Sequence, residues 1–97
     1  MYNIKYSKEA LKDIQRLKAV KLDQKAKHLV DIIKEDPFTY PPEWEALQGD
    51  LKGYYSRRIN IKHRLVYQVD QDRKVVRILR MWSHYDKVHP GAKRTKA

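Results

Sequence analysis

The fold is decided by residues 54–67, which read YYSRRINIKHRLVY. Two runs of aromatic, aliphatic and arginine residues flank a short polar stretch, a pattern that predicts two strands joined by a tight connection. Successive side chains on a strand point to opposite faces, so Arg57 and Arg58 project from opposite sides and Arg58 shares its face with Ser56. The pattern predicts one apolar sheet face that covers a core and one face where guanidinium groups lie beside aromatic rings.

Such a face suits a nucleic-acid backbone. Guanidinium forks match phosphate oxygens in two-point hydrogen bonds, and aromatic rings stack on bases. The whole chain is strongly basic, with 22 Lys and Arg against 12 Asp and Glu and a formal charge of +10. A chain of this charge is attracted to nucleic acid or to a strongly acidic protein, although surface lysines that only maintain solubility would give the same balance.

Length and composition narrow the class of protein further. The 97 residues suit one domain with one core, and the absence of cysteine excludes disulfides and thiolate chemistry. The histidines have no Cys, Asp or Glu at ligand spacing, so we expect neither a metal site nor a cofactor. Apolar runs are too short to span a membrane, and the N-terminus lacks the apolar segment of a secretory signal. We therefore expect a cytoplasmic protein without a membrane partner.

Alternating and helical periodicities predict the elements outside this stretch. The expected elements are a strand at 1–6, a helix capped by Ser7, a second helix at about 22–35, and strands at 54–59, 64–70 and 74–82. The last strand is apolar on both faces, which predicts a place inside the sheet. The predicted class is therefore α+β, with both helices on one face of the sheet and an open basic face opposite.

Residues 37–53 show no periodicity, and their prolines and glycines predict a loop. We expect its large apolar side chains to hold it against the body of the protein; they are Phe38, Tyr40, Trp44 and Leu47. Residues 1–85 are the predicted domain, and residues 86–97 form a polar, basic tail that we expect to be flexible.

The open face and its surroundings carry the groups that RNA cleavage without a metal requires. A base must take the proton of the 2′-hydroxyl, an acid must protonate the leaving 5′-oxygen, and cations must stabilise the phosphate. Glu45 suits the base and His84 the acid, while Arg58 and Arg64 suit a phosphate clamp and Tyr85 a phosphate or base contact. Each also has an ordinary structural interpretation, such as a solvated loop carboxylate or a surface histidine.

Other polar and aromatic residues near this face are weaker candidates. Arg57 is expected to be a surface or ion-pairing residue rather than a catalytic one, and His63 a structural or solvent-facing residue. Candidate RNA or ribosome contacts are Gln48, Lys52, Tyr54, Lys62 and Trp82. Trp82 also suits an anchor of the core.

The order of these residues resembles the YoeB/Txe-type toxins of the RelE superfamily. The motifs that carry the resemblance are Glu45-x-Leu47, the run from Leu51 to Ile59, His63-Arg64-Leu65-Val66-Tyr67, and His84-Tyr85. The resemblance covers residues 37–85 and implies a RelE-like β-α-α-β-β-β order, with two N-terminal helices on a curved antiparallel sheet. It also implies that Glu45 is the general base, His84 the general acid, and Arg58 and Arg64 the phosphate-binding arginines, with Tyr85 completing the catalytic set.

The function implied by the resemblance is that of the toxin of a type II toxin–antitoxin system. Such a toxin is an endoribonuclease, or mRNA interferase, that cleaves mRNA in the ribosomal A site and arrests translation. The implied partners are mRNA, rRNA and a cognate antitoxin whose acidic segment folds on binding, and the toxin–antitoxin complex would bind promoter DNA. The resemblance leaves both a monomer and a homodimer open.

This sequence departs from the family pattern in two places. Gln48 stands where a basic residue often follows the catalytic Glu by three positions, which removes one positive charge from the clamp and predicts some loss of activity. The chain also continues beyond His84-Tyr85 into the basic tail.

Two alternatives remain open at this point. A toxin of the same fold acting on a protein such as DNA gyrase would share the layout but needs no Glu, His and Tyr set. A non-enzymatic nucleic-acid-binding module would use the arginines for backbone contacts alone, and its binding would not depend on the 2′-hydroxyl.

Overall fold

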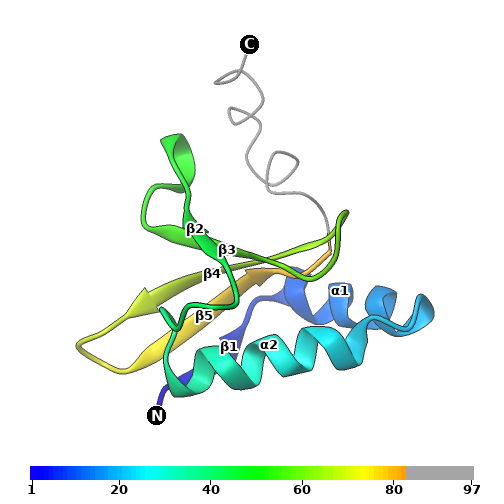
Figure 1. The fold of residues 1–97 in the computed structure, drawn as a ribbon, viewed down its shortest axis with the longest axis horizontal. Helices are drawn as coiled ribbons and strands as arrows, with labels where there is room; N and C mark the ends of the chain where they lie inside the picture. Colours follow the sequence, from blue (N-terminus) through cyan, green and yellow to red (C-terminus); the bar gives the residue numbers. More distant parts are fainter. Residues whose placement is uncertain (83–97) are drawn as a thin grey trace.

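A computed structural model describes residues 1–82 of the chain, which build a five-stranded sheet with two helices packed on one of its faces (Figure 1). In chain order the elements are β1 (Asn3–Tyr6), α1 (Lys8–Ala19), α2 (Asp23–Glu35), β2 (Trp44–Ala46), the 3₁₀ turn η1 (Gly49–Leu51), β3 (Tyr54–Arg58), β4 (Arg64–Asp70) and β5 (Val75–Arg80). The strand order across the sheet is β1-β5-β4-β3-β2. β1 runs parallel to β5, whereas the other neighbouring strands are antiparallel.

The predicted class, with both helices on one face of a mainly antiparallel sheet, is confirmed. β5 lies between β1 and β4, as its two apolar faces predicted. The order differs by one strand, because residues 44–46 of the expected loop form β2 against β3. Three residues are too few for an alternating pattern to be recognised in a sequence.

The helices begin and end where local chemistry dictates. The Ser7 hydroxyl accepts a hydrogen bond from the Ala10 N–H at 2.9 Å, which caps α1 as predicted. The same hydroxyl donates to the Leu79 carbonyl of β5 at 2.7 Å, so one side chain both starts the helix and fastens it to the sheet. α2 ends at Glu35 because the residue before Pro37 is driven into an extended conformation.

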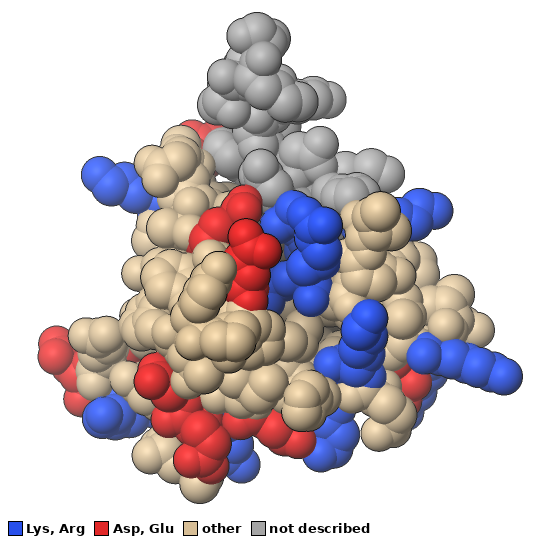
Figure 2. All heavy atoms as spheres, viewed as in Figure 1, with Lys and Arg blue, Asp and Glu red and all other residues tan. Residues whose placement is uncertain are grey.

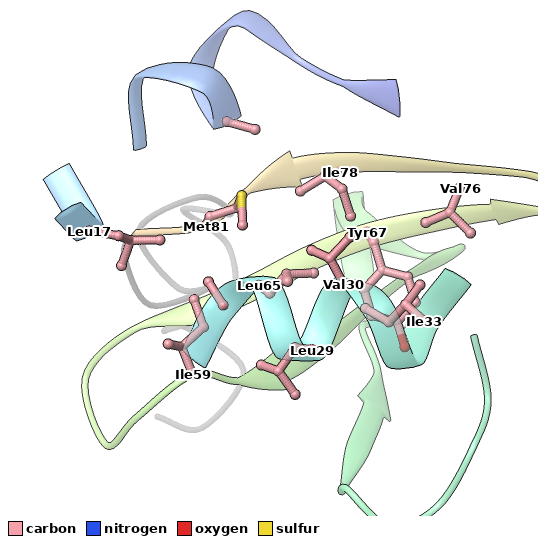
Figure 3. Packing of buried hydrophobic residues seen from close by; sticks show 12 residues of the cluster. Leu17, Leu29, Val30, Ile33, Ile59, Leu65, Tyr67, Val76, Ile78 and Met81 are labelled. Atoms are coloured by element: carbon pink, nitrogen blue, oxygen red, sulfur yellow. The ribbon is translucent and has the colours of Figure 1, made fainter. Parts of the chain in front are cut away.

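The core lies between the helices and the sheet face that they cover (Figure 3). Its fully buried members include Leu17 from α1, Ile33 from α2 and Leu65, Tyr67 and Ile78 from the sheet. Helical side chains recur every three or four residues and strand side chains every second residue, so each element presents one apolar face to this core. The opposite face of β2, β3 and β4 carries mainly polar and charged side chains, together with the buried Val66 opposite Ser56.

A buried carboxylate fastens α1 to the end of β5. Asp13 is 1% exposed and accepts hydrogen bonds from Arg80 Nε at 2.9 Å and from the Met81 N–H at 2.9 Å. A further Arg80 nitrogen donates to the second oxygen at 3.3 Å. This hydrogen bond with Asp13 raises the pKa of Arg80. The contact orders the chain just before the point where the described residues end.

Candidate active site

Strand pairing places the candidate catalytic residues on one face of the sheet. Glu45 of β2 lies opposite Ser56 of β3, and Arg58 of β3 lies opposite Arg64 of β4. Directly opposed residues in an antiparallel pair project to the same face, and residues two apart on one strand do so as well. The four side chains therefore gather on the face that the helices leave open.

The carboxylate of Glu45 meets the guanidinium of Arg64. Glu45 Oε2 lies 3.8 Å from Arg64 Nη1, and the same nitrogen donates a hydrogen bond to Ser56 Oγ at 3.3 Å. The Arg64 side chain is 15% exposed whereas that of Glu45 is 48% exposed. The Ser56 hydroxyl thus fixes the Arg64 guanidinium close to the sheet, whereas the carboxylate oxygens of Glu45 remain accessible to a ligand.

A small hollow of ≈ 30 Å³ marks this place on the surface. Its lining residues are Glu43, Trp44, Glu45, Ser56, Arg58 and Arg64. Figure 2 shows acidic and basic side chains side by side over the part of the sheet that carries β2 and β3. The hollow has about the volume of one water molecule, so a nucleotide would lie across the site rather than inside it.

Two arginines are paired across β3 and β4 at the end of the strands where the chain turns from one to the other. Arg58 is exposed, and its cross-strand partner is Arg64. Like charges on opposed positions repel each other, and an anion bound between them removes that repulsion. The pair therefore suits a phosphate, which offers oxygens to both forks.

Arg57 differs from its expected surface or ion-pairing role. It is fully buried, and its guanidinium donates to the carbonyls of Pro37 at 2.9 Å, Thr39 at 2.9 Å and Pro42 at 2.7 Å. Its Nε donates to the Tyr67 hydroxyl at 3.1 Å. The three carbonyl acceptors come from the loop before β2, which covers Arg57 on the sheet face opposite Arg58.

Aromatic rings complete the anchorage of this loop. Ring centroids lie 5.3 Å apart for Phe38 and Trp44, 5.0 Å for Phe38 and Tyr55, and 5.8 Å for Tyr55 and Tyr67. The Trp44 indole also donates to the Phe38 carbonyl at 3.1 Å. Phe38, Trp44 and the buried Leu47 hold the loop as predicted, whereas Tyr40 is 68% exposed and the prediction for it was wrong.

Tyr67 lies at the junction of this cluster and the core. Its hydroxyl donates to the Pro37 carbonyl at 2.8 Å. Burial raises the pKa of Tyr67, and the neighbouring Arg57 opposes part of that rise. The phenol is therefore held as a neutral hydrogen-bonding group under the loop.

The remaining predicted contact residues lie around the open face. Gln48, Lys52 and Lys62 are exposed, and Tyr54 is half-buried opposite Gln68. Gln48 follows Glu45 by three residues, in the segment that leads into η1. Their contacts with RNA stay predictions.

Trp82 has partners within the protein. Its ring stacks on that of His63 with centroids 4.1 Å apart, and its carbonyl is hydrogen-bonded to His63 Nδ1. The Arg16 guanidinium lies 5.8 Å from the Trp82 ring centroid. His63 is thus structural, and the role of Trp82 in contacting RNA stays a prediction beside its clear role as an anchor.

Ser56 is the site residue that sequence reasoning left without a role. The alternation of β3 placed it on the Arg58 face, but a serine in a strand gives no sign of the arginine that it will hold. His84 and Tyr85 lie outside the described residues, as does the tail at 86–97. Within residues 1–82, no group of three or more His, Asp or Glu side chains is placed to hold a metal ion. Neither helix of this described part is long and apolar enough to cross a membrane.

Comparison with known proteins identifies similar sequences and structures. A family model described as the YoeB-like toxin of bacterial type II toxin–antitoxin systems matches residues 6–85. The toxin RelK of Mycobacterium tuberculosis is 46% identical over 57 residues, which are 59% of this chain. The match spans 65% of the length of that relative, slightly less than two thirds.

Solved structures share the fold over most of the chain. The YoeB/ParE toxin from Agrobacterium tumefaciens is 27% identical with a TM-score of 0.78, covering 86% of this chain and 99% of that one. In a YoeB–YefM complex from Staphylococcus aureus, the matching chain is 34% identical with a TM-score of 0.73, covering 88% and 99%. A YoeB dimer from the same species is also 34% identical, with a TM-score of 0.74, covering 87% and 98%.

Proposed function

The chain belongs to the YoeB-like toxins of bacterial type II toxin–antitoxin systems, and from this premise we propose that it is a ribosome-dependent endoribonuclease that cleaves mRNA in the A site. The observation that carries the proposal is the half-exposed carboxylate of Glu45, 3.8 Å from the Arg64 guanidinium on an open face that also presents Arg58. A base beside two phosphate-binding groups supplies two of the three functions that metal-free transesterification of RNA requires, and a general acid is the third.

Glu45 acts as the general base in this proposal. Its carboxylate takes the proton of a 2′-hydroxyl, and the 2′-oxygen forms a bond to the adjacent phosphorus while the bond from phosphorus to the 5′-oxygen breaks. The products are a 2′,3′-cyclic phosphate and a 5′-hydroxyl, so the step consumes neither water nor a cofactor. A positioned base of this kind contributes about 10²–10⁴ in rate.

Arg58 and Arg64 bind the phosphate whose oxygens gain charge in the transition state. Arg64 is pre-positioned by Ser56 and by Glu45, so little reorganisation accompanies the reaction. Arg58 is exposed and reaches the phosphate from the neighbouring strand. Removal of one such donor costs about 10²–10³ in rate.

His84 is the proposed general acid, and Tyr85 the proposed phosphate or base contact. These roles come from the match of His84-Tyr85 to the family motif. The bond to the leaving 5′-oxygen breaks with transfer of a proton from the His84 imidazole, which balances the proton taken by Glu45. Gln48, Lys52, Tyr54, Lys62 and Trp82 are proposed further contacts to mRNA or rRNA.

We infer the partners from the same premise. The Staphylococcus aureus relative has been solved with YefM, and we propose that a cognate antitoxin neutralises this chain. An acidic segment that folds on binding would complement the +10 charge and cover Arg58 and Arg64. We propose that the toxin–antitoxin complex, rather than the toxin alone, binds promoter DNA. Action on ribosomes implies a cytoplasmic location. The solved YoeB dimer of the relative suggests a homodimer for this chain as well.

Primer extension on a defined mRNA tests the function directly. Wild type should give sharp new 5′ ends only with translating ribosomes, and Glu45→Ala should give none. A 2′-deoxy nucleotide at the cut position should block cleavage and leave binding intact, because only the reaction uses the 2′-hydroxyl. Intact mRNA during growth arrest would reject the nuclease and favour a gyrase-directed toxin or a simple nucleic-acid binder.

A further inference from the structure

A buried guanidinium organises the loop that delivers the proposed base. Arg57 is fully buried, and its two terminal nitrogens donate to the carbonyls of Pro37, Thr39 and Pro42 at 2.7–2.9 Å. Its Nε donates to the Tyr67 hydroxyl at 3.1 Å. One side chain therefore binds three carbonyls within the six loop residues 37–42 and links them, through the Tyr67 hydroxyl, to the central strand β4.

Only arginine fits this set of acceptors. Its N–H groups point outward from a rigid plane in fixed directions, so one head group reaches carbonyls on different sides. A lysine ammonium has three donors on a single nitrogen and cannot span the same positions. A buried charge with neutral acceptors is costly to the fold, which indicates that the contact serves more than packing.

The held loop leads directly to Glu45. Pro42 precedes β2 by two residues, and Trp44, the first residue of β2, is the cross-strand partner of Arg57. The Trp44 indole donates back to the Phe38 carbonyl in the same loop. β2 is only three residues long and lies at the edge of the sheet, so its own pairing with β3 gives it little rigidity.

We propose that Arg57 is a positioning residue for the reaction: it fixes the loop at 37–42 and, through Trp44, the Glu45 carboxylate against Arg64. The inference rests on the proposed function, in which Glu45 is the base. Arg57 touches no substrate in this scheme, and the neighbouring Arg58 binds phosphate from the other face of the same strand. A displacement of about 1 Å at a reacting group costs about 10²-fold in rate.

A double-mutant cycle between Arg57 and Glu45 tests the proposal. Single-turnover cleavage of mRNA on saturating ribosomes is measured for wild type, Arg57→Lys, Glu45→Gln and the double variant, with rates corrected for the folded fraction. Val76→Ala is the control for lost stability, because it opens a cavity in the core on β5, a strand that pairs with neither β2 nor β3. Affinity for ribosomes is measured in parallel.

We expect Arg57→Lys to cleave about 10²-fold more slowly than wild type with unchanged ribosome affinity, while Val76→Ala keeps the wild-type rate per folded molecule. In the Glu45→Gln background the same substitution should cause no further loss, because the base that it positions is already absent. Tyr67→Phe, which removes one acceptor of Arg57, should show a smaller loss with the same dependence on Glu45 and serves if Arg57→Lys does not fold.

Two results would overturn the proposal. One is a rate for both loop variants equal to that of Val76→Ala, and the other is an equal loss in the presence and absence of the Glu45 carboxylate. If the proposed function itself is wrong, the result is different: cleavage of mRNA would not depend on the Glu45 carboxylate, and wild type and Glu45→Gln would have the same cleavage rate. That result would reject this inference together with its premise.

Discussion

Glu45 Oε2 and Arg64 Nη1 lie 3.8 Å apart, although the strands that carry them are separated in the sheet by β3. The contact spans β3 above Ser56, which is opposite Glu45 and holds the same Arg64 nitrogen. The proposed base and the proposed phosphate ligand are thereby set at the distance of a loose ion pair. A loose pair whose carboxylate is half-exposed contributes little to folding, which supports the proposed catalytic role of Glu45.

Glu45→Gln removes the proposed base while keeping its size. We expect cleavage of ribosome-bound mRNA to fall about 10²–10⁴-fold, with a free energy of unfolding within about 0.5 kcal/mol of wild type, because the side chain is half-exposed. Single-turnover cleavage and urea denaturation measure the two quantities. Glu43→Gln is the control, since it removes the same charge from the same hollow. A larger loss of cleavage rate for Glu43→Gln than for Glu45→Gln would identify Glu43 as the general base instead.

Gln48→Lys restores the positive charge that the family pattern has three positions after the base. We expect an increase in cleavage rate of up to roughly fivefold, because an exposed charge interaction contributes about 0.2–1 kcal/mol. Gln71→Lys adds the same charge in the exposed turn between β4 and β5 and should leave the rate unchanged. Dose-response curves for cleavage at low and high salt measure both variants. An equal gain for both would show a general effect of charge.

Local chemistry made much of the fold predictable. Ser7 caps the start of α1, and Pro37 ends α2 because its ring drives the preceding residue into an extended conformation; both effects act on immediate neighbours. β4 has the predicted bounds, residues 64–70, because its alternation is long and strong. Alternation also predicted the strand at 1–6, which is β1. The parallel pairing of β1 with β5 and the short strand β2 depend on contacts between distant segments, which periodicity does not report.

The sequence predicted which residues would make up the candidate site better than it predicted how they contact one another. Alternation placed Arg58 with Ser56, and register then brought Arg64 and Glu45 to them. Arg57 was misjudged because its acceptors are main-chain carbonyls 15 to 20 residues away, which no side-chain pattern reveals. Backbone acceptors become visible only when the loop is folded.

Asp13→Asn should strongly destabilise the protein. The buried carboxylate accepts from Arg80 and from the Met81 N–H, and an amide leaves the guanidinium charge without compensation. We expect a loss of about 3 kcal/mol in free energy of unfolding, at the lower end for a buried pair because Arg80 is 25% exposed. Asp31→Asn, from the exposed pair with Lys27, should change it by less than about 0.5 kcal/mol. Urea denaturation measures the free energy of unfolding of both variants. An equal change in the two would refute the structural role of Asp13.

Tyr67→Phe should flatten the loss of stability at alkaline pH. Burial raises the pKa of Tyr67 in the folded protein, whereas an unfolded tyrosine titrates near about 10. Above pH ~10 the unfolded chain therefore holds fewer protons, and this one group lowers the free energy of unfolding by up to about 1.4 kcal/mol per pH unit until the folded phenol also ionises. The phenylalanine variant loses about 1–3 kcal/mol at neutral pH, because the hydroxyl bonds Pro37 and Arg57, yet declines less steeply. Tyr40→Phe, at an exposed ring, should keep the wild-type slope, and a wild-type slope in Tyr67→Phe would exclude this phenol as its source.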